Sequence, residues 1–161
     1  MRNLWRKTLL GAGMAVAALL VGSPGSASTQ VAFNGTFQNI SARTTDFRQA
    51  DGNTFISQTV QVVYAGDLSG SVVEHIDLVI HPDGSLNFNG ADVCACTLAG
   101  TGRSGTLVLP FSGTGDASGA ASGRFTIKGV GSLANLHGVG TFQSSNGGSS
   151  GPFSGVYHFD P

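Results

Sequence analysis

Apolar and polar residues alternate along most of the chain after residue 27, with the period of two that β-strands show. The alternation divides into segments bounded by residues that favour turns. The eight segments are residues 31–42, 55–65, 68–81, 85–98, 104–113, 121–130, 132–143 and 152–160. No window has the period of an amphipathic helix. The pattern therefore predicts an all-β fold of consecutive strands.

Two architectures fit this pattern. Eight antiparallel strands are the number found in a small closed barrel, whose interior is filled or holds one small ligand. A two-sheet sandwich can be built from the same strands, so the alternation leaves both architectures open. Glycines inside the predicted strands, such as Gly35, Gly90 and Gly140, would weaken a flat sheet. They suit a strongly coiled sheet with bends and bulges, which slightly favours the barrel.

Residues 1–27 have the three-part organisation of a secretory signal peptide. Three basic residues among the first seven precede the apolar stretch 9–21, and small residues follow up to Ala27. A membrane-spanning helix needs about 20 apolar residues, so an uncleaved anchor is the weaker alternative. No cysteine follows the apolar stretch, which argues against a lipoprotein. We expect cleavage after Ala27, a secreted or periplasmic protein, and a single β-barrel domain over residues 28–161.

Charged residues are sparse, at 11% of the chain, against about a quarter in typical domains. After residue 27, nine acidic residues outnumber five basic ones, and the basic residues form no stripe. This mildly acidic balance argues against nucleic acid as a partner. Low charge together with 25 glycines is also found in disordered chains, but the recurring apolar positions favour a packed β domain.

Several glycine-rich segments follow one another in a recognisable order. A Gly-Asp-Leu-Ser-Gly segment at 66–70 precedes Glu74, a Gly-Arg-Ser-Gly segment occupies 102–105, and a glycine-rich segment spans 129–140. In this order they resemble a family of uncharacterised bacterial proteins with the allene-oxide-cyclase-like barrel. The resemblance runs from about Val31 to Phe159. It implies an eight-stranded antiparallel closed barrel and carries no assigned activity.

The sequence departs from that family in two features. One is the signal peptide, and the other is the pair Cys94 and Cys96, which the resemblance does not include. The matching motifs are glycine placements, so they bear on the fold and leave the chemistry to individual side chains.

Glu74 is the only glutamate of the chain. Alternate residues of the segment 72–80 form one face that is apolar apart from Glu74, so this side chain should point into the interior. Desolvation there raises the pKa of a carboxyl group unless a cation or hydrogen-bond donors meet it. We interpret Glu74 as a ligand-binding residue, and as the acid–base group if the protein is an enzyme. The structural alternative is an ion pair with Arg103 or Arg124, or hydrogen bonds from backbone NH groups. Arg103 is a second candidate in the ligand site.

Cys94 and Cys96 are separated by one residue on a predicted strand, so both side chains should lie on one face. In an extended strand their Cα atoms would be about 6.7 Å apart, near the upper limit for a disulfide. A bond between them would therefore need a local bulge or turn. Core thiols, a strained local disulfide and a metal or redox site all remain open. Their face also carries Leu86, Phe88, Asp92 and Leu98 and resembles another interior surface, so both cysteines are included among the candidate ligand-binding residues.

No metal site or cofactor is predicted. His75, Asp77 and His81 share the other face of the Glu74 segment, but their spacing along a strand is wide and a solvated outer face is the better interpretation. The segment 129–134 imitates a dinucleotide fingerprint, which requires a following helix where a strand is predicted. The chain has no nucleophile elbow and no recognisable catalytic triad.

These features favour a secreted barrel that binds a small, mostly apolar ligand around Glu74. An isomerase or cyclase in which Glu74 moves a proton is the second hypothesis. A surface or matrix protein without a small ligand is the third, since the chain is rich in Gly, Ser and Thr and poor in charge. A homo-oligomer is compatible with the weakly charged outer faces, and no membrane contact is expected once the signal peptide is removed.

Overall fold

The computed structural model describes residues 28–145 and 147–161. Eight strands and one short 3₁₀ turn make up this part of the chain. They are β1 (Val31–Ala50), β2 (Asn53–Gly66), β3 (Leu68–Ile80), β4 (Leu86–Leu98), β5 (Arg103–Gly115), β6 (Ala121–Val130), η1 (Gly131–Leu133), β7 (Leu136–Ser144) and β8 (Ser150–Phe159). The predicted signal peptide lies outside the described residues. Within them, no helix is long and apolar enough to cross a membrane.

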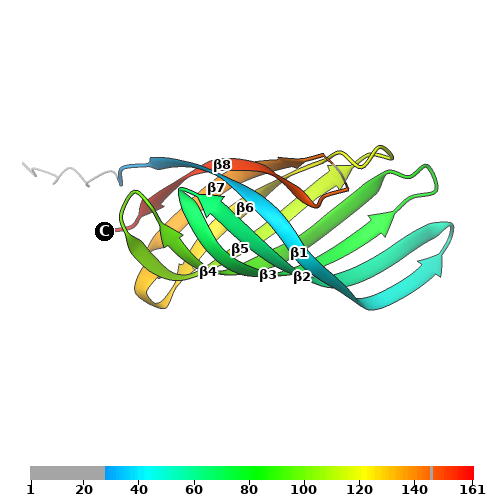
Figure 1. Ribbon diagram of the computed structural model, residues 1–161, viewed down its shortest axis with the longest axis horizontal. Helices are drawn as coiled ribbons and strands as arrows, with labels where there is room; N and C mark the ends of the chain where they lie inside the picture. The colour runs from blue at the N-terminus through cyan, green and yellow to red at the C-terminus, as the bar shows by residue number, and fades with distance from the viewer. Residues whose placement is uncertain (1–27, 146) are drawn as a thin grey trace, which may run out of the picture.

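Each strand pairs antiparallel with the next, and β8 returns to pair with β1, so the sheet closes on itself (Figure 1). Eight antiparallel strands in one closed ring confirm the all-β prediction. The sandwich alternative is wrong, because every strand has two hydrogen-bonded neighbours in a single sheet.

Two predicted strand boundaries differ from the structure by more than two residues. The first strand was expected to end at residue 42 but continues to Ala50, through register shifts between Asn39 and Ser41 and between Thr44 and Asp46. Such bulges interrupt the alternation of side chains, so the sequence pattern faded while the strand continued. The seventh strand was expected from residue 132, but it begins at Leu136, after the η1 turn.

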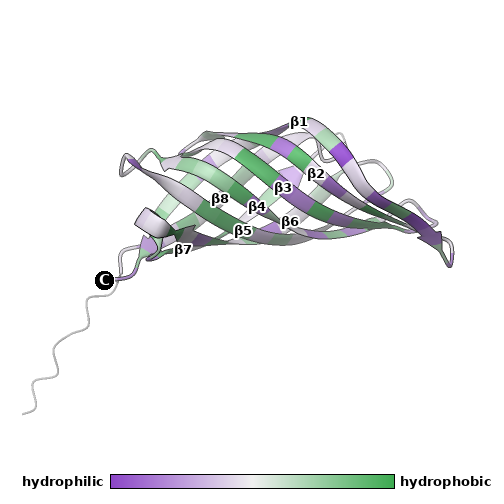
Figure 2. Ribbon diagram, turned by 90° about the horizontal axis from the view of Figure 1, so that it is seen from below, coloured by the Kyte–Doolittle hydropathy of each residue, from purple (hydrophilic) through white to green (hydrophobic). Residues whose placement is uncertain are grey.

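The barrel has two different ends. One end, which we call the turn end, carries the turns β1–β2, β3–β4, β5–β6 and β7–β8 (Figure 1). At the opposite end, which we call the terminal end, β1 starts and β8 finishes. Only residues 31–38 of β1 pair with β8. The remainder of β1 pairs with β2 alone and forms a hairpin that projects from the turn end, with hydrophilic residues at its tip (Figure 2).

Aliphatic side chains fill the terminal end of the barrel. Five leucines there are at most 2% exposed, and they come from β3, β4, β5, β7 and η1. These are Leu68, Leu98, Leu107, Leu133 and Leu136. Close packing at this end leaves the free interior space nearer the turn end.

Aromatic rings occupy the middle of the barrel, and six of them lie over a glycine directly opposite on the neighbouring strand. A Cβ atom at any of these glycines would collide with the ring and with a backbone carbonyl oxygen. The pairs are Gly35 with Phe153, Gly155 with Phe33, Gly90 with Phe111, Gly113 with Phe88, Gly123 with Phe142 and Gly140 with Phe125. These glycines therefore make room for the rings, in addition to easing the coiling of the sheet.

Replacing one of these glycines tests the packing. We expect Gly113→Ala to lower the free energy of unfolding by about 1–3 kcal/mol, because the new methyl group meets the Phe88 ring and the Ser122 carbonyl oxygen. Urea unfolding measures the loss. The matched control is Gly100→Ala in the β4–β5 turn, where the nearest atom to a Cβ is the Tyr157 hydroxyl oxygen at 3.7 Å. Equal stability of the two variants would contradict this account.

Candidate functional site

Two acidic side chains meet inside the barrel. Glu74 of β3 lies directly opposite Asp92 of β4, and the alternation of β3 places Glu74 on the interior face as the sequence predicted. Asp92 is only 6% exposed. Asp92 was expected on the interior face that it shares with Cys94 and Cys96, but its pairing with Glu74 was not predicted.

Tyr64 of β2 completes the polar group. Its hydroxyl donates a hydrogen bond to Oδ2 of Asp92, and its ring packs against Phe153 with the centroids 5.0 Å apart. Within residues 28–145 and 147–161, Oδ1 of Asp92 has no hydrogen-bond partner. A hydrogen bond between Glu74 and Asp92 contributes to the pKa of both carboxyl groups, and it requires a proton on one of them.

Burial controls the ionisation of this group. Desolvation, followed by the nearby Asp92 charge and the hydrogen bond to Asp92, raises the pKa of Glu74 to about 8. Desolvation also raises the pKa of Asp92 to about 6, although hydrogen bonds from Tyr64 and Glu74 oppose the rise. Burial raises the pKa of Tyr64 well above its usual value. At neutral pH the two carboxyl groups therefore hold one proton and one negative charge between them.

Two adjoining cavities surround the acid pair. The smaller has a volume of about 50 Å³ and contains both carboxyl groups and the Tyr64 side chain among its walls. The larger, of about 390 Å³, extends to the turn end, where glycines of the β5–β6 and β7–β8 turns line its mouth. Phe37, Glu74 and Phe142 line both cavities, so Glu74 stands at their junction.

Three buried side-chain atoms lack a hydrogen-bond partner among the described residues, and all three belong to cavity-lining residues. They are Asp92 Oδ1 in the smaller cavity and Asn39 Oδ1 and Ser144 Oγ in the larger. Buried polar groups in proteins are nearly always hydrogen-bonded. Unpaired acceptors concentrated along one interior space indicate that this space receives polar atoms from outside the chain.

The alternative of an ion pair between Glu74 and an arginine is wrong. Arg103 lies exposed at the terminal end, where its guanidinium group is 4.2 Å from the Phe159 ring centroid and donates to the Ser132 carbonyl oxygen. Arg124 is exposed on β6. Neither lines the cavities around Glu74. The structural reason is the cross-strand register, which places an acid opposite Glu74.

Cys94 and Cys96 form a disulfide, one of the three alternatives that the sequence left open. Their Cα atoms are 5.2 Å apart, closer than an extended strand allows, yet β4 keeps an unbroken register with both neighbours. The strand is therefore locally contracted, and the predicted bulge is absent. Gly70 and Gly105 lie opposite Cys96 on the two sides, which leaves room for the contraction. Both cysteines are buried in the core and line neither cavity.

The histidines of the Glu74 segment do not form a site. His75 contacts Thr59, Asp77 accepts a hydrogen bond from Ser57, and His81 contacts Asn53 and Asn87. Among residues 28–145 and 147–161, no group of three or more His, Cys, Asp and Glu side chains is placed to hold a metal ion.

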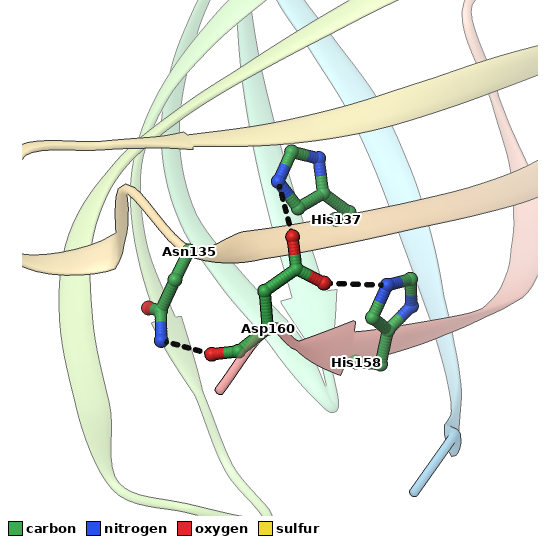
Figure 3. Close-up of polar contacts among 4 residues, drawn as sticks. All are labelled: Asn135, His137, His158 and Asp160. Atoms are coloured by element: carbon green, nitrogen blue, oxygen red, sulfur yellow. Dashed lines mark hydrogen bonds and ion pairs between the residues drawn. The ribbon is translucent and has the colours of Figure 1, made fainter. Parts of the chain in front are cut away.

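A second polar cluster lies at the terminal end (Figure 3). Asp160 stands between His137 and His158, with carboxylate oxygens 3.3 and 3.2 Å from their Nε2 atoms. Asn135 donates through its side chain to the Asp160 carbonyl oxygen. The cluster is partly exposed and joins the end of the chain to β7 and the preceding loop, which is a structural role.

The acid pair makes stability fall as pH rises. The folded protein keeps protons on Glu74 and Asp92 that the unfolded chain releases near pH 4, so the free energy of unfolding decreases between pH 5 and pH 8. At about 1.4 kcal/mol for each unit of pKa shift, the loss amounts to a few kcal/mol. Urea unfolding across this range measures it.

Glu74→Gln should remove the decrease above pH 6, where Glu74 alone still titrates. Asp77→Asn, a change to the exposed carboxyl group on the other face of β3, is the control and should leave the slope unaltered. A Glu74→Gln protein with the original slope would show that another group titrates.

Comparison with known proteins identifies a family. The sequence profile described as "Protein of unknown function (DUF3224)" matches residues 33–154. A crystal structure of a DUF3224 protein of unknown function from Shewanella oneidensis MR-1 is similar, with a TM-score of 0.61 and 19% sequence identity. The similarity covers 84% of this chain and 99% of that one, and at this identity it bears on the fold alone. No curated protein matches the chain. The resemblance to an uncharacterised bacterial family is thus confirmed in its coarse form: this chain belongs to the DUF3224 family.

Proposed function

We propose that the protein is exported and binds a small, mostly apolar molecule inside the barrel, with the acid pair as the polar end of the site. The observation that carries this proposal is the coincidence of the cavities with every unpaired buried side-chain acceptor in the described residues. A barrel whose interior served only packing would gain nothing from leaving these acceptors unpaired.

The larger cavity has the size and lining of a ligand site. Small-molecule sites in proteins occupy about 300–1,000 Å³ and combine apolar walls with a few polar groups. At about 390 Å³ the cavity is in this range. Val60, Ile76, Leu78 and Phe88 supply apolar walls, and Glu74 supplies a polar group at the inner end.

The mouth of the cavity has an ordered rim. The Gly147 amide donates to the Gly119 carbonyl oxygen, and the Asn39 amide donates to the Ser149 carbonyl oxygen. These bonds connect the β7–β8 turn to the β5–β6 turn and to β1. A rim of this kind supports a largely preformed site, which reduces the ordering cost of binding.

Acid–base catalysis is the second candidate function, and the shared proton favours it. A carboxylic acid with a pKa of about 8 beside an ionised carboxylate can donate or accept a proton near neutral pH. An isomerase or cyclase would use Glu74 in this way. If a substrate is found, unchanged turnover in Glu74→Gln would remove this role.

Three further features belong to the proposal. The signal peptide at residues 1–27 supports export, the glycine-rich motifs support an allene-oxide-cyclase-like form of the ring, and the weakly charged outer strands are compatible with a homo-oligomer. A solidly packed interior would have supported the surface-protein alternative, whereas a cavity of about 390 Å³ favours the ligand-binding proposal.

Blocking the cavity should abolish binding of a small apolar molecule. We expect octan-1-ol to bind the unmodified protein in ligand-observed NMR titrations, and Ile76→Trp to weaken binding at least tenfold because the indole occupies the larger cavity. The matched control is Val73→Trp, a change on the outer face of the same strand, where the valine is 36% exposed.

Leu78→Trp provides an independent block from the same cavity wall. Thermal melts verify that each variant folds. Equal octan-1-ol affinity in the inner and outer tryptophan variants would place binding outside the barrel and overturn the proposed function.

A further inference from the structure

We propose that the interior site selects an organic cation, a primary ammonium group on an apolar tail, over carboxylate and uncharged ligands. This inference rests on the proposed function, because it names the chemical class of the molecule bound in the cavity. It is carried by the charge, the aromatic lining and the size of the inner cavity.

The acid pair has no positive partner within the described part of the chain. The five basic side chains there are all exposed, and none lines the inner cavity or the larger one. A buried negative charge without a counter-ion is costly, since the low-dielectric interior replaces its hydration poorly. A cationic ligand supplies the missing charge, whereas a carboxylate ligand adds a second negative charge beside the first.

The hydrogen-bonding capacity of the pair points the same way. Tyr64 already donates its proton to Asp92, and the proton of Glu74 lies in the hydrogen bond between the two carboxyl groups, so neither is available to a ligand. Asp92 Oδ1 is a free acceptor. An ammonium group, with three donors and no acceptor, is complementary to such a site, and a ligand carboxylate is not.

Aromatic side chains form most of the remaining wall. The six are Phe37, Tyr64, Phe111, Phe125, Phe142 and Phe153. Several pack edge to face, as Phe37 does against Phe142 and Phe125 against Phe153. The faces of aromatic rings carry negative electrostatic potential and attract ligand cations. The wall therefore adds to the attraction of the acid pair for a positive group.

The inner cavity also sets the size of the group. Its volume is about 50 Å³, which is enough to hold a group the size of a water molecule. A primary ammonium group is of that size and has three N–H donors, whereas a trimethylammonium group is larger and has none. The larger cavity receives the apolar tail beyond Glu74.

Binding of the cation should release a proton. A positive charge beside the pair stabilises its doubly ionised form, so the proton held by Glu74 passes to the solvent as the ammonium group enters. No bond other than this O–H bond is broken. A neutral ligand leaves the proton on Glu74. Proton release therefore distinguishes a cationic from a neutral ligand independently of their affinities.

The test compares four ligands with one tail: octylamine, octan-1-ol, octanoate and octyltrimethylammonium. Isothermal titration calorimetry at pH 7 should show octylamine binding at least tenfold more tightly than octan-1-ol, with the other two weaker than octan-1-ol. Repeating the octylamine titration in buffers of different ionisation enthalpy should reveal proton release. Octan-1-ol should show none.

Asp92→Asn should remove the preference for octylamine over octan-1-ol, and Glu74→Gln should abolish the proton release. Asp77→Asn on the outer face is the matched control and should change neither. Octan-1-ol binding without a preference for octylamine would overturn this inference and leave the proposed function standing. Failure of both ligands to bind would overturn the proposed function itself. Octylamine binding unaltered in both acid variants would also overturn the inference.

Discussion

Closure of the barrel depends on a repeated contact between a phenylalanine ring and the glycine opposite it. The contact occurs in reciprocal pairs on β1–β8, β4–β5 and β6–β7, where each strand contributes one ring and one glycine two residues away. A side chain at the glycine would exclude the ring from the middle of the barrel. The glycines thus allow a small ring of strands to accommodate many aromatic side chains, and the rings replace the packing that the glycines lack.

The chemistry of the acid pair follows from this aromatic interior. Water is displaced from Glu74 and Asp92 by rings rather than by hydrogen-bonding groups, so desolvation is the largest cause of both raised pKa values. The leucines that close the barrel lie at the terminal end. The space beside the acid pair, toward the turn end, is therefore left unfilled. The arrangement therefore combines a partly charged acid pair, an apolar wall and access from the turn end.

Much of the fold and half of the acid pair could be predicted from the sequence. Alternation identified the eight strands and the inward position of Glu74, since both depend on local periodicity. Asp92 was missed as its partner because the pairing depends on register. The position of the turn around Asp83 could have indicated this pairing. Residues 74 and 92 are equally far from residue 83 along the hairpin, so they lie opposite each other. The end of β1 was missed because bulges break the alternation, and the arginine partners of Glu74 were wrong because strand order alone does not fix which residues face each other.

Two acids in the middle of an apolar barrel are not explained by stability. Their raised pKa values mean that the interior disfavours their charged forms, and apolar side chains of similar volume would avoid that cost. Tyr64 satisfies only one oxygen of Asp92, so the pair is not a completed structural network. A protein that retains a destabilising, incompletely bonded polar group beside an accessible cavity has the arrangement expected where function opposes stability. A ligand that supplies the missing positive charge and donors would reverse that imbalance, which connects the energetics of the acid pair to the molecule that the barrel is suited to bind.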